Sequence, residues 1–379
     1  MNVLFVAPLP EPTTGQSLAS RVLLDDLAKC HSVAVVNLSQ HGLRPGIRSW
    51  SRIGQVLRIA WRVFRGMRSA DVVYVTISES IAGNCKDLLL YALCGRMLQR
   101  VVVHLHGGAG MRLLMAKGTL TRWINTLFLG RIGGVIVLGK RHVPIFEGVV
   151  AADRLHIVPN FAEDDLFVTT QDIDKKFSAP SPLRILFLSN LLVGKGHREL
   201  LEAFLRLGSE ARRLIRLDFA GSFDTAEARI DFVDRIGRVP EVTYHGPVSG
   251  ERKRLLLREA HVFCLPTYYP YEGQPISILE AYASGCAVIT TDHSGIFDVF
   301  TPEVNGYAVE KKSIDSLVMA LERAVAAPAG LRAFATANHA IALKQYRSNA
   351  YTRSLLQVLE TTWAASRATD GSRGERRRV

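Results

Sequence analysis

Two glutamates, Glu272 and Glu280, stand eight positions apart around the start of a predicted helix, in the run Y-P-Y-E-G-Q-P-I-S-I-L-E-A-Y-A-S-G. Pro275 suits the first position of that helix, where no backbone donor is needed, and Gly285 suits its end. The free N–H groups of a helix N-terminus favour anions, and Gly273 allows the backbone to approach a phosphate closely. The run therefore predicts a diphosphate at this N-terminus, with one carboxylate reaching a sugar and the other a ribose.

A second positive group is expected at the same phosphates. Lys195, in G-K-G-H, follows a predicted strand and precedes a predicted helix, so that its ammonium can stand over them. Asp172 and Asp174 form a D-x-D pattern of the kind that binds divalent metals, but they fall in a polar stretch and are interpreted as solvated surface. No essential metal is predicted, because Lys195 and the helix N-terminus can supply the positive potential.

These motifs resemble those of the retaining glycosyltransferases of family 4, whose signature is E-G-x-P-x-x-x-x-E, and every fixed position of it is present here. The resemblance implies a GT-B fold, in which two Rossmann-like domains face a cleft and the C-terminal one holds the donor nucleotide. It implies that Glu272 binds sugar hydroxyls, that Glu280 binds the ribose, and that Lys195 binds the diphosphate. The donor-binding residues that it implies in addition are Gly15, Asn190, Val248, Gly273, Gln274, Pro275 and Ile276.

Two positions depart from the family pattern or carry a second interpretation. Asn190 occupies the position of an arginine in the family pattern, and asparagine donates a hydrogen bond without a charge. Stabilisation of the leaving group would therefore depend more on Lys195 and on the backbone amides of the helix. His106, in H-L-H-G-G, comes at the carboxyl end of an apolar strand, where ligands bind in open α/β sheets. A lone histidine is more often structural, but the glycines after it and the resemblance place His106 with Glu272 among the predicted catalytic residues, and His104 deeper in the sheet.

Alternating strand-like and helix-like runs support this fold class independently. Five or six such pairs precede residue 160, and a second series begins at R-I-L-F-L-S-N, a pattern typical of parallel sheets covered by helices. Neither series opens with G-x-G-x-x-G, which disfavours a nicotinamide dehydrogenase. The chain is predicted to begin with an acceptor domain over 1–160, followed by a linker over 161–182 and a donor domain over 183–345. A helix of about 346–366 is predicted to return to the first domain, and a mobile basic tail over 367–379 follows it.

The net charge of +12 is concentrated in the N-terminal part of the chain. Residues 1–160 hold 19 Lys and Arg against 8 Asp and Glu, and residues 27–70 contain no acid. In that stretch Trp50, Ile53, Leu57, Trp61 and Phe64 alternate with arginines at 44, 48, 52, 58, 62, 65 and 68. A basic amphipathic segment of this kind can lie on anionic lipid, bind nucleic acid or simply be a solvated helix. Peripheral membrane contact is favoured, and nucleic acid is not, because no nucleic-acid-binding motif accompanies the charge.

Composition and length add further expectations. The 379 residues, 48% of them hydrophobic, suffice for two domains with substantial cores. The five cysteines form no C-x-x-C pair and are interpreted as buried thiols of a reducing compartment. The start, M-N-V-L-F-V-A-P-L-P, is interpreted as a first strand and no apolar run reaches the ~18 residues of a membrane span. A cytoplasmic location is therefore expected, at the inner face of the membrane where the protein meets lipid.

The leading hypothesis is transfer of a sugar from a UDP- or GDP-sugar to an acceptor hydroxyl with retained configuration, without a cofactor. The resemblance to bacterial enzymes of surface-polysaccharide synthesis implies a polyprenyl-diphosphate-linked saccharide as acceptor. Two alternatives stay open at this point: a non-catalytic or RNA-binding protein on the same fold, which Asn190 supports, and a sugar nucleotide epimerase, which would need no acceptor.

Overall fold

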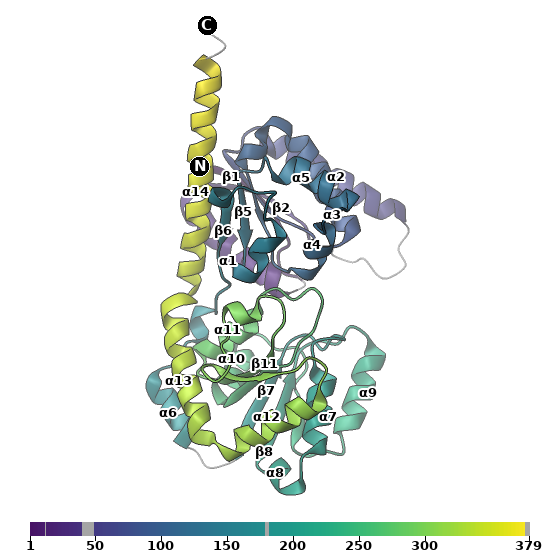
Figure 1. The fold of residues 1–379 in the computed structure, drawn as a ribbon, viewed down its shortest axis with the longest axis vertical. Coiled ribbons are helices and arrows are strands. Elements are labelled where there is room, and N and C mark those ends of the chain that lie inside the picture. Colours follow the sequence, from purple (N-terminus) through teal and green to yellow (C-terminus); the bar gives the residue numbers. More distant parts are fainter. Residues whose placement is uncertain (12, 40–48, 179–181, 376–379) are drawn as a thin grey trace. The chain divides into compact units, whose positions relative to one another are not determined.

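The computed structural model describes residues 1–11, 13–39, 49–178 and 182–375, and for 49–53 and 369–375 it describes the helix alone. The chain divides into two compact units, unit 1 with Met1–Pro159 and Asn349–Val379, and unit 2 with Asn160–Ser348. Each unit contains a six-stranded parallel sheet covered by helices on both faces (Figure 1). The predicted α/β class with two Rossmann-like domains is confirmed.

Unit 1 is built on a sheet of order β2-β1-β3-β4-β5-β6. Its strands are β1 (Asn2–Ala7), β2 (Ser32–Asn37), β3 (Val72–Thr76), β4 (Val101–His104), β5 (Gly134–Val137) and β6 (Leu155–Ile157). Its helices are α1 (Gly15–Cys30), α2 (Ser49–Met67), α3 (Ile81–Cys94), α4 (Ala109–Leu114), α5 (Leu120–Leu129) and α14 (Ser348–Glu375), with short 3-10 turns η1 (Gly95–Arg100), η2 (Lys140–Ile145) and η3 (Ala152–Arg154).

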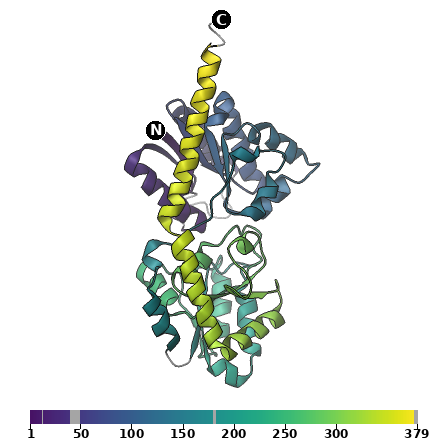
Figure 2. The same ribbon diagram turned by 60° about the vertical axis from the view of Figure 1, so that its left-hand side comes forward.

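The two faces of the unit 1 sheet bury different residues, because side chains alternate along each strand. On one face, Leu4 and Val6 join a core with Val63 of α2. On the other face, the ring of Phe5 stacks on that of Tyr74 with centroids 5.0 Å apart. Figure 2 shows α14 lying across one face of this sheet, on which Leu355 and Leu359 are fully buried.

Unit 2 has a sheet of order β12-β11-β10-β7-β8-β9. Its strands are β7 (Leu183–Leu188), β8 (Ile215–Ala220), β9 (Val242–Tyr244), β10 (Val262–Leu265), β11 (Ala287–Thr291) and β12 (Gly306–Val309). Its helices are α6 (Thr170–Ser178), α7 (His197–Arg206), α8 (Ser209–Arg213), α9 (Ala226–Ile236), α10 (Gly250–Glu259), α11 (Ile276–Ala283), α12 (Ile314–Ala326) and α13 (Pro328–Gln345), with 3-10 turns η4 (Asp164–Leu166) and η5 (Ile296–Asp298).

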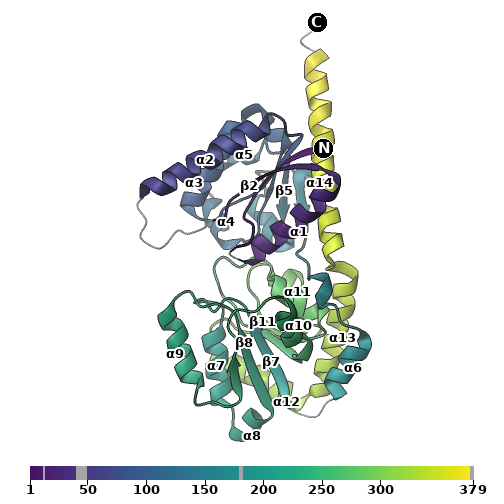
Figure 3. The ribbon, with the colours of Figure 1, turned by 180° about the vertical axis from the view of Figure 1, so that it is seen from behind.

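The strand order of unit 2 reverses between β7 and β10. From β7 the chain moves outward through β8 and β9, and it then crosses to β10 and moves outward the other way. Helices α7 and α9 lie on one side of the sheet, and α10, α11 and α13 lie on the other (Figure 3). Ligands of open α/β sheets bind outside the carboxyl ends of the strands at such a reversal. A ligand site in unit 2 is therefore expected at the loops after β7 and β10.

The structure differs from the predicted divisions in three places. The stretch predicted as a linker, 161–182, is packed within unit 2 over its described part, because α6 buries Ile173 and Lys176. The tail predicted to be mobile from 367 is helical through Glu375, and residues 376–379 lie outside the described residues. The strand β12, at an edge of the sheet, was not predicted.

The burial of the cysteines agrees only in part with the prediction. Cys94, Cys264 and Cys286 are buried, whereas Cys30 and Cys85 are exposed, so the prediction of buried thiols was wrong for two of the five. Across the described residues, no helix combines the length and the apolar character needed to traverse a bilayer.

Candidate active site

The predicted helix with the glutamate pair is α11, in unit 2. Pro275 caps it with a non-helical ψ of 119°, one residue before the helical run that begins at Ile276. Gly285 follows its end with φ +64°, and a Cβ there would lie 2.5 Å from Ile173 Cγ1, so only glycine fits. The helix is buried on all sides rather than on one face: Ile278, Leu279 and Tyr282 are each 0% exposed. Its N-terminus is thus held rigidly at the carboxyl edge of the sheet.

Lys195 and Glu272 meet at the reversal of the sheet. Lys195 lies in the loop after β7 and Glu272 in the loop after β10, and Lys195 Nζ is 2.6 Å from Glu272 Oε2. Thr267 donates its hydroxyl proton to the same carboxylate oxygen at 3.3 Å. The two charged side chains are only 13% and 10% exposed. A charge-assisted pair that is this well shielded is strong, and it places a cation and a carboxylate just ahead of α11.

Two glycines allow this approach. Gly194 and Gly196, on either side of Lys195, have φ of +94° and +88°, which glycine adopts readily. A Cβ on Gly196 would lie 2.4 Å from the carbonyl oxygen of Pro266. The ammonium also lies 4.9 Å from the centre of the Tyr269 ring, within range of a cation–π contact. The G-K-G sequence therefore presses Lys195 against the loop that carries Glu272.

Glu280 is part of a separate buried cluster around Lys253. Lys253 Nζ lies 2.6 Å from Glu280 Oε1 and also donates to Glu163. Burial raises the pKa of Glu280, and the neighbouring ammonium offsets only part of that effect. Burial alone would lower the pKa of Lys253, but the two carboxylates outweigh it and raise that pKa. Neither Lys253 nor Glu163 was predicted, because nothing in the spacing of R-K-R or A-E-D-D marks a contact with a residue so distant in sequence.

Gln274 and Gly273 hold the shape of the loop. The backbone N–H of Asn160 donates to Gln274 Oε1, and its side-chain amide donates to the Gln274 carbonyl oxygen, both at 2.7 Å. Gly273 accepts a 2.9 Å hydrogen bond from the backbone of Gly295. Among the described residues, Asn160 Oδ1 is buried without a hydrogen-bond partner. The loop between Glu272 and α11 is therefore tied down on two sides.

The other two residues of the predicted donor set lie on the same edge of unit 2. Asn190 is exposed in the turn after β7, and Val248 is half-buried after β9, against the unit 2 core. The structure thus brings together Lys195, Glu272 and the start of α11. Asn190 and Val248 lie in the loops after β7 and β9.

Unit 1 places His106 two residues after the end of β4. Its ring lies 4.0 Å from that of His104, centre to centre, and its Nε2 atom is buried without a hydrogen-bond partner among the described residues. Burial lowers the pKa of His106 to about 3, so the imidazole is neutral at physiological pH. His104 is deeper in the sheet, as predicted, and its Nδ1 atom lies 2.7 Å from the hydroxyl of Tyr74.

A half-buried carboxylate against Gly107, the residue after His106, was not predicted. Glu79 follows β3, and its Oε2 atom accepts hydrogen bonds from the backbone N–H groups of Gly110 (3.0 Å) and Met111 (3.4 Å). A Cβ on Gly107 would lie 1.5 Å from Glu79 Oε1, so the glycine makes room for the carboxylate. Burial raises the pKa of Glu79 against the effect of these hydrogen bonds. The sequence signal was the position of a glutamate directly after a strand that neighbours β4.

Gly15 is the first residue of α1 and is exposed. Thr14 precedes it as N-cap: its hydroxyl oxygen accepts from the backbone N–H of Ser17 at 3.1 Å, and its own backbone N–H donates to the Ser17 hydroxyl oxygen at 2.8 Å. The turn follows β1, and the strand order of unit 1 reverses between β1 and β3. Gly15 therefore lies at the edge where an open sheet binds ligands.

The D-x-D pair does not form a joint site. Asp172 pairs with Arg258 and Asp174 pairs with Arg332, each at 2.6 Å. In the part of the chain that the structure describes, no three His, Cys, Asp or Glu side chains gather as a metal site would require.

Comparison with known proteins gives a consistent family. Residues 168–341 match the model of "Glycosyl transferases group 1". An uncharacterized glycosyltransferase of Methanocaldococcus jannaschii is 31% identical over 139 residues, which are 37% of this chain and 35% of that protein. The amylovoran biosynthesis glycosyltransferase AmsK of Erwinia amylovora is 28% identical over 196 residues, 47% of this chain and 45% of AmsK. The matched regions thus span less than half of either relative.

The fold has close counterparts among solved structures. HepE of Anabaena, solved in complex with UDP, superimposes with a TM-score of 0.72 at 14% identity, covering 95% of this chain and 100% of HepE. At that identity the likeness establishes the fold alone. Residues 168–341 are therefore similar to the glycosyl transferases group 1 family, and the chain has the GT-B fold of the family 4 glycosyltransferases that its sequence resembles.

Proposed function

We propose that this protein is a retaining hexosyltransferase that moves a sugar from a nucleoside diphosphate sugar to an acceptor hydroxyl. The observation that carries the proposal is the 2.6 Å contact between Lys195 Nζ and Glu272 Oε2 ahead of the N-terminus of α11. The ammonium and the helix N-terminus stabilise the negative charge of a departing diphosphate. The carboxylate accepts hydrogen bonds from sugar hydroxyls. Glu280 takes the ribose in this proposal, and the ammonium of Lys253 opposes the rise in its pKa that burial causes.

The reaction that fits these residues is displacement on one face of the sugar. The acceptor oxygen forms a bond to the anomeric carbon on the side from which the diphosphate oxygen departs, and the acceptor proton passes to that departing oxygen. Neither Glu272 nor Glu280 is a free nucleophile, because each is already paired with a lysine. The neutral imidazole of His106 supplies a hydrogen bond in the reacting region without adding a charge.

For the donor we propose a UDP-sugar, bound without metal. HepE, which has the same fold, was solved with UDP and with UDP-glucose, and this supports uridine over guanosine. Calorimetry with UDP, GDP and ADP in the presence of EDTA tests the proposal. UDP should bind best, and Lys195→Ala should weaken it. Equal affinity in the two proteins would exclude Lys195 from the diphosphate site.

The anomeric outcome is tested separately. Nuclear magnetic resonance of the product at early time points should show the anomeric configuration of the donor. An inverted product would overturn the retaining mechanism, and conversion of the donor sugar without an acceptor would point to an epimerase.

We further propose that the acceptor is a polyprenyl-diphosphate-linked saccharide of polysaccharide synthesis, met at the cytoplasmic face of an anionic membrane. The support is a surface of unit 1, here called the α2–α5 surface. On α2 it exposes Leu57, Trp61 and Phe64, and on α5 it exposes Leu120, Trp123 and Leu127. The arginines at 58, 62, 65 and 68 are exposed beside them, and neither helix contains an acid. AmsK, named for amylovoran biosynthesis, is consistent with such a product.

The α2–α5 surface suits lipid because it combines aromatic and aliphatic side chains with unopposed positive charge. Arg44 and Arg48 of the predicted basic segment lie outside the described residues, and the side chain of Arg52 is not described. Flotation with phosphatidylglycerol vesicles tests the proposal. The wild type should float, and a variant with glutamate at 58, 62 and 65 should not. Arg213→Glu, at an exposed arginine of α8 in unit 2, is the matched control and should float. No flotation of the wild type would indicate a soluble acceptor.

A further inference from the structure

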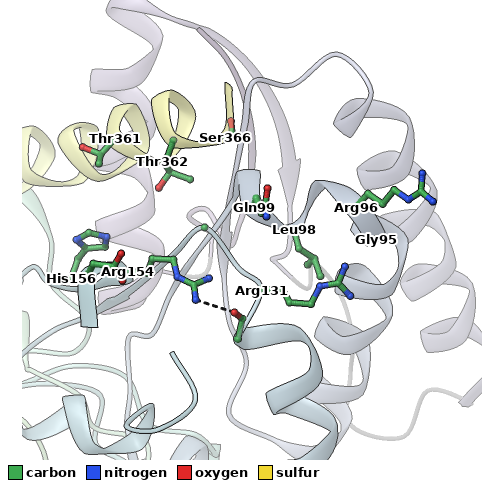
Figure 4. Close-up of a pocket in the computed structure, with 14 residues that line it drawn as sticks. Gly95, Arg96, Leu98, Gln99, Arg131, Arg154, His156, Thr361, Thr362 and Ser366 are labelled. Atoms are coloured by element: carbon green, nitrogen blue, oxygen red, sulfur yellow. Dashed lines mark hydrogen bonds between the residues drawn. The ribbon is translucent and has the colours of Figure 1, made fainter. Parts of the chain in front are cut away.

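A cavity of about 800 Å³ lies within unit 1, away from the residues assigned above. Figure 4 shows the side chains that line it, which come from η1, from the turns before β5 and β6, and from α14. Arg100 directly precedes β4, Gly133 directly precedes β5, and Arg154 directly precedes β6. The cavity is therefore at the amino ends of these strands. His106 follows the opposite end of β4, about 17 Å away at ~3.3 Å per residue.

The lining of this cavity carries an excess of positive charge, because three arginines line it and Asp153 is the one acidic residue among the lining residues. Arg96, Arg131 and Arg154 line it, and within the described part of the chain none of their guanidinium groups lies within 4.0 Å of a carboxylate. Arg154 is half-buried and donates to the carbonyl oxygens of Ile132 (2.8 Å) and Gly130 (3.0 Å). These bonds fix the guanidinium but leave its charge uncompensated. In Figure 4, the side chain of Arg96 extends away from that of Arg154.

Asp153, His156 and several neutral hydrogen-bonding groups complete the lining. The amide of Gln99 comes from η1, and α14 contributes the exposed hydroxyl of Thr361. The wall is closely packed, because a Cβ on Gly133 would lie 2.2 Å from the Gln99 carbonyl oxygen and 2.6 Å from Thr362 Cγ2. The glycine thus allows α14 to approach the ends of the strands, and the cavity is a built feature of the fold.

We propose that this cavity binds an organic phosphate, with the phosphate held by Arg131 and Arg154 and the remainder of the molecule lying along α14. Arginine is suited to phosphate through paired N–H donors. The volume is within the ~300–1,000 Å³ of small-molecule sites and far exceeds the need of an inorganic ion. The ligand carries a body the size of a sugar or nucleoside. This second site is independent of the donor site, since none of its residues belongs to unit 2.

The phosphate ester has two sources, a soluble metabolite or a lipid headgroup, and the experiment separates them. Calorimetry on the full chain uses glucose 6-phosphate, with glucose as the uncharged control, and a second arm uses phosphatidylglycerol vesicles. Glucose 6-phosphate should bind and glucose should not. Arg131→Glu should weaken binding roughly tenfold or more, the loss of a charge-assisted hydrogen bond. Its side chain is exposed, so the fold should be kept.

Three controls make the result decisive. Arg213→Glu removes an exposed arginine of α8 in unit 2 and should leave binding unchanged, and Lys195→Ala should leave glucose 6-phosphate binding unchanged too, because it alters only the donor site. Ala365→Trp, which fills the cavity from α14 without removing a charge, should also abolish binding. Binding to vesicles alone that depends on Arg131 would identify a lipid headgroup as the source. The proposal would be overturned if Arg213→Glu weakened binding as much as Arg131→Glu, if Lys195→Ala abolished glucose 6-phosphate binding, or if neither glucose 6-phosphate nor vesicles bound.

Discussion

At the scale of single residues, Lys195 and Glu272 form an ion pair with each other, and their two roles are separable by substitution. Glu272→Gln keeps a hydrogen-bonding group beside Lys195 but loses the carboxylate. We expect sugar transfer to fall by about 10²–10³-fold, the scale of losing one transition-state contact. UDP should bind at least as well as before, because Lys195 no longer has an anionic partner. Turnover and calorimetry on the same protein measure both.

The converse substitution, Lys195→Ala, removes the cation and should raise the Kd for UDP as well as lower kcat. Circular dichroism and the thermal midpoint serve as the control for folding in both variants. A Glu272→Gln protein that is folded and fully active would remove Glu272 from the site.

At the scale of elements, the loop between β7 and α7 depends on the backbone of Gly196. Its φ of +88° and the 2.4 Å from a Cβ to the Pro266 oxygen exclude a side chain without movement of the loop. Gly196→Ala should therefore weaken UDP binding and lower the free energy of unfolding by at least ~1 kcal/mol, the cost of a left-handed alanine. Gly208→Ala is the matched control, because no atom lies within 4 Å of a Cβ there. Equal Kd values for UDP in the two variants would refute this role.

The backbone carbonyl groups at the end of α11 accept hydrogen bonds from Lys176 of α6. Lys176 Nζ donates to the carbonyl oxygens of Ala260, Ser284 and Gly285 at 2.7–2.9 Å. Lys176→Met should lower the free energy of unfolding by about 2–3 kcal/mol, because buried carbonyls lose their donor. Chemical denaturation measures this, and Lys175→Met on the same helix is the control. A loss no larger than that of the control would show that the three hydrogen bonds are dispensable.

The elements also show what the sequence could predict. The alternation of apolar runs and helical runs located β1 to β11 but missed β12, which lies at an edge of the unit 2 sheet. The polar composition around 161–182 was interpreted as a linker, yet Ile173 and Lys176 bury it. Lys195 and Glu272 belong to local motifs and were predicted, whereas Lys253, Glu163 and Glu79 act through contacts that only the fold creates.

At the scale of the whole molecule, several histidines are kept neutral by burial. The pKa is lowered to about 3 for His106 and to about 4 for His142, His197 and His261, in each case chiefly by burial. The unfolded chain takes up these protons near its ordinary pKa of 6.5, whereas the folded chain does not. The free energy of unfolding should therefore fall as pH decreases from 6.5 to 4, by up to ~1.4 kcal/mol per pH unit for each histidine.

His197 makes this pH dependence testable in one position. Its ring packs among those of Phe187, Phe223 and Phe232, with centroids 5.8–6.0 Å away, and its Nδ1 atom has no hydrogen-bond partner among the described residues. A phenylalanine fits the same aromatic surroundings and has no proton to gain. His197→Phe should keep the fold at neutral pH and lose less stability than the wild type between pH 6.5 and 4. Denaturation at a series of pH values measures the difference, and parallel curves for the two proteins would mean that His197 titrates alike in the folded and unfolded chain.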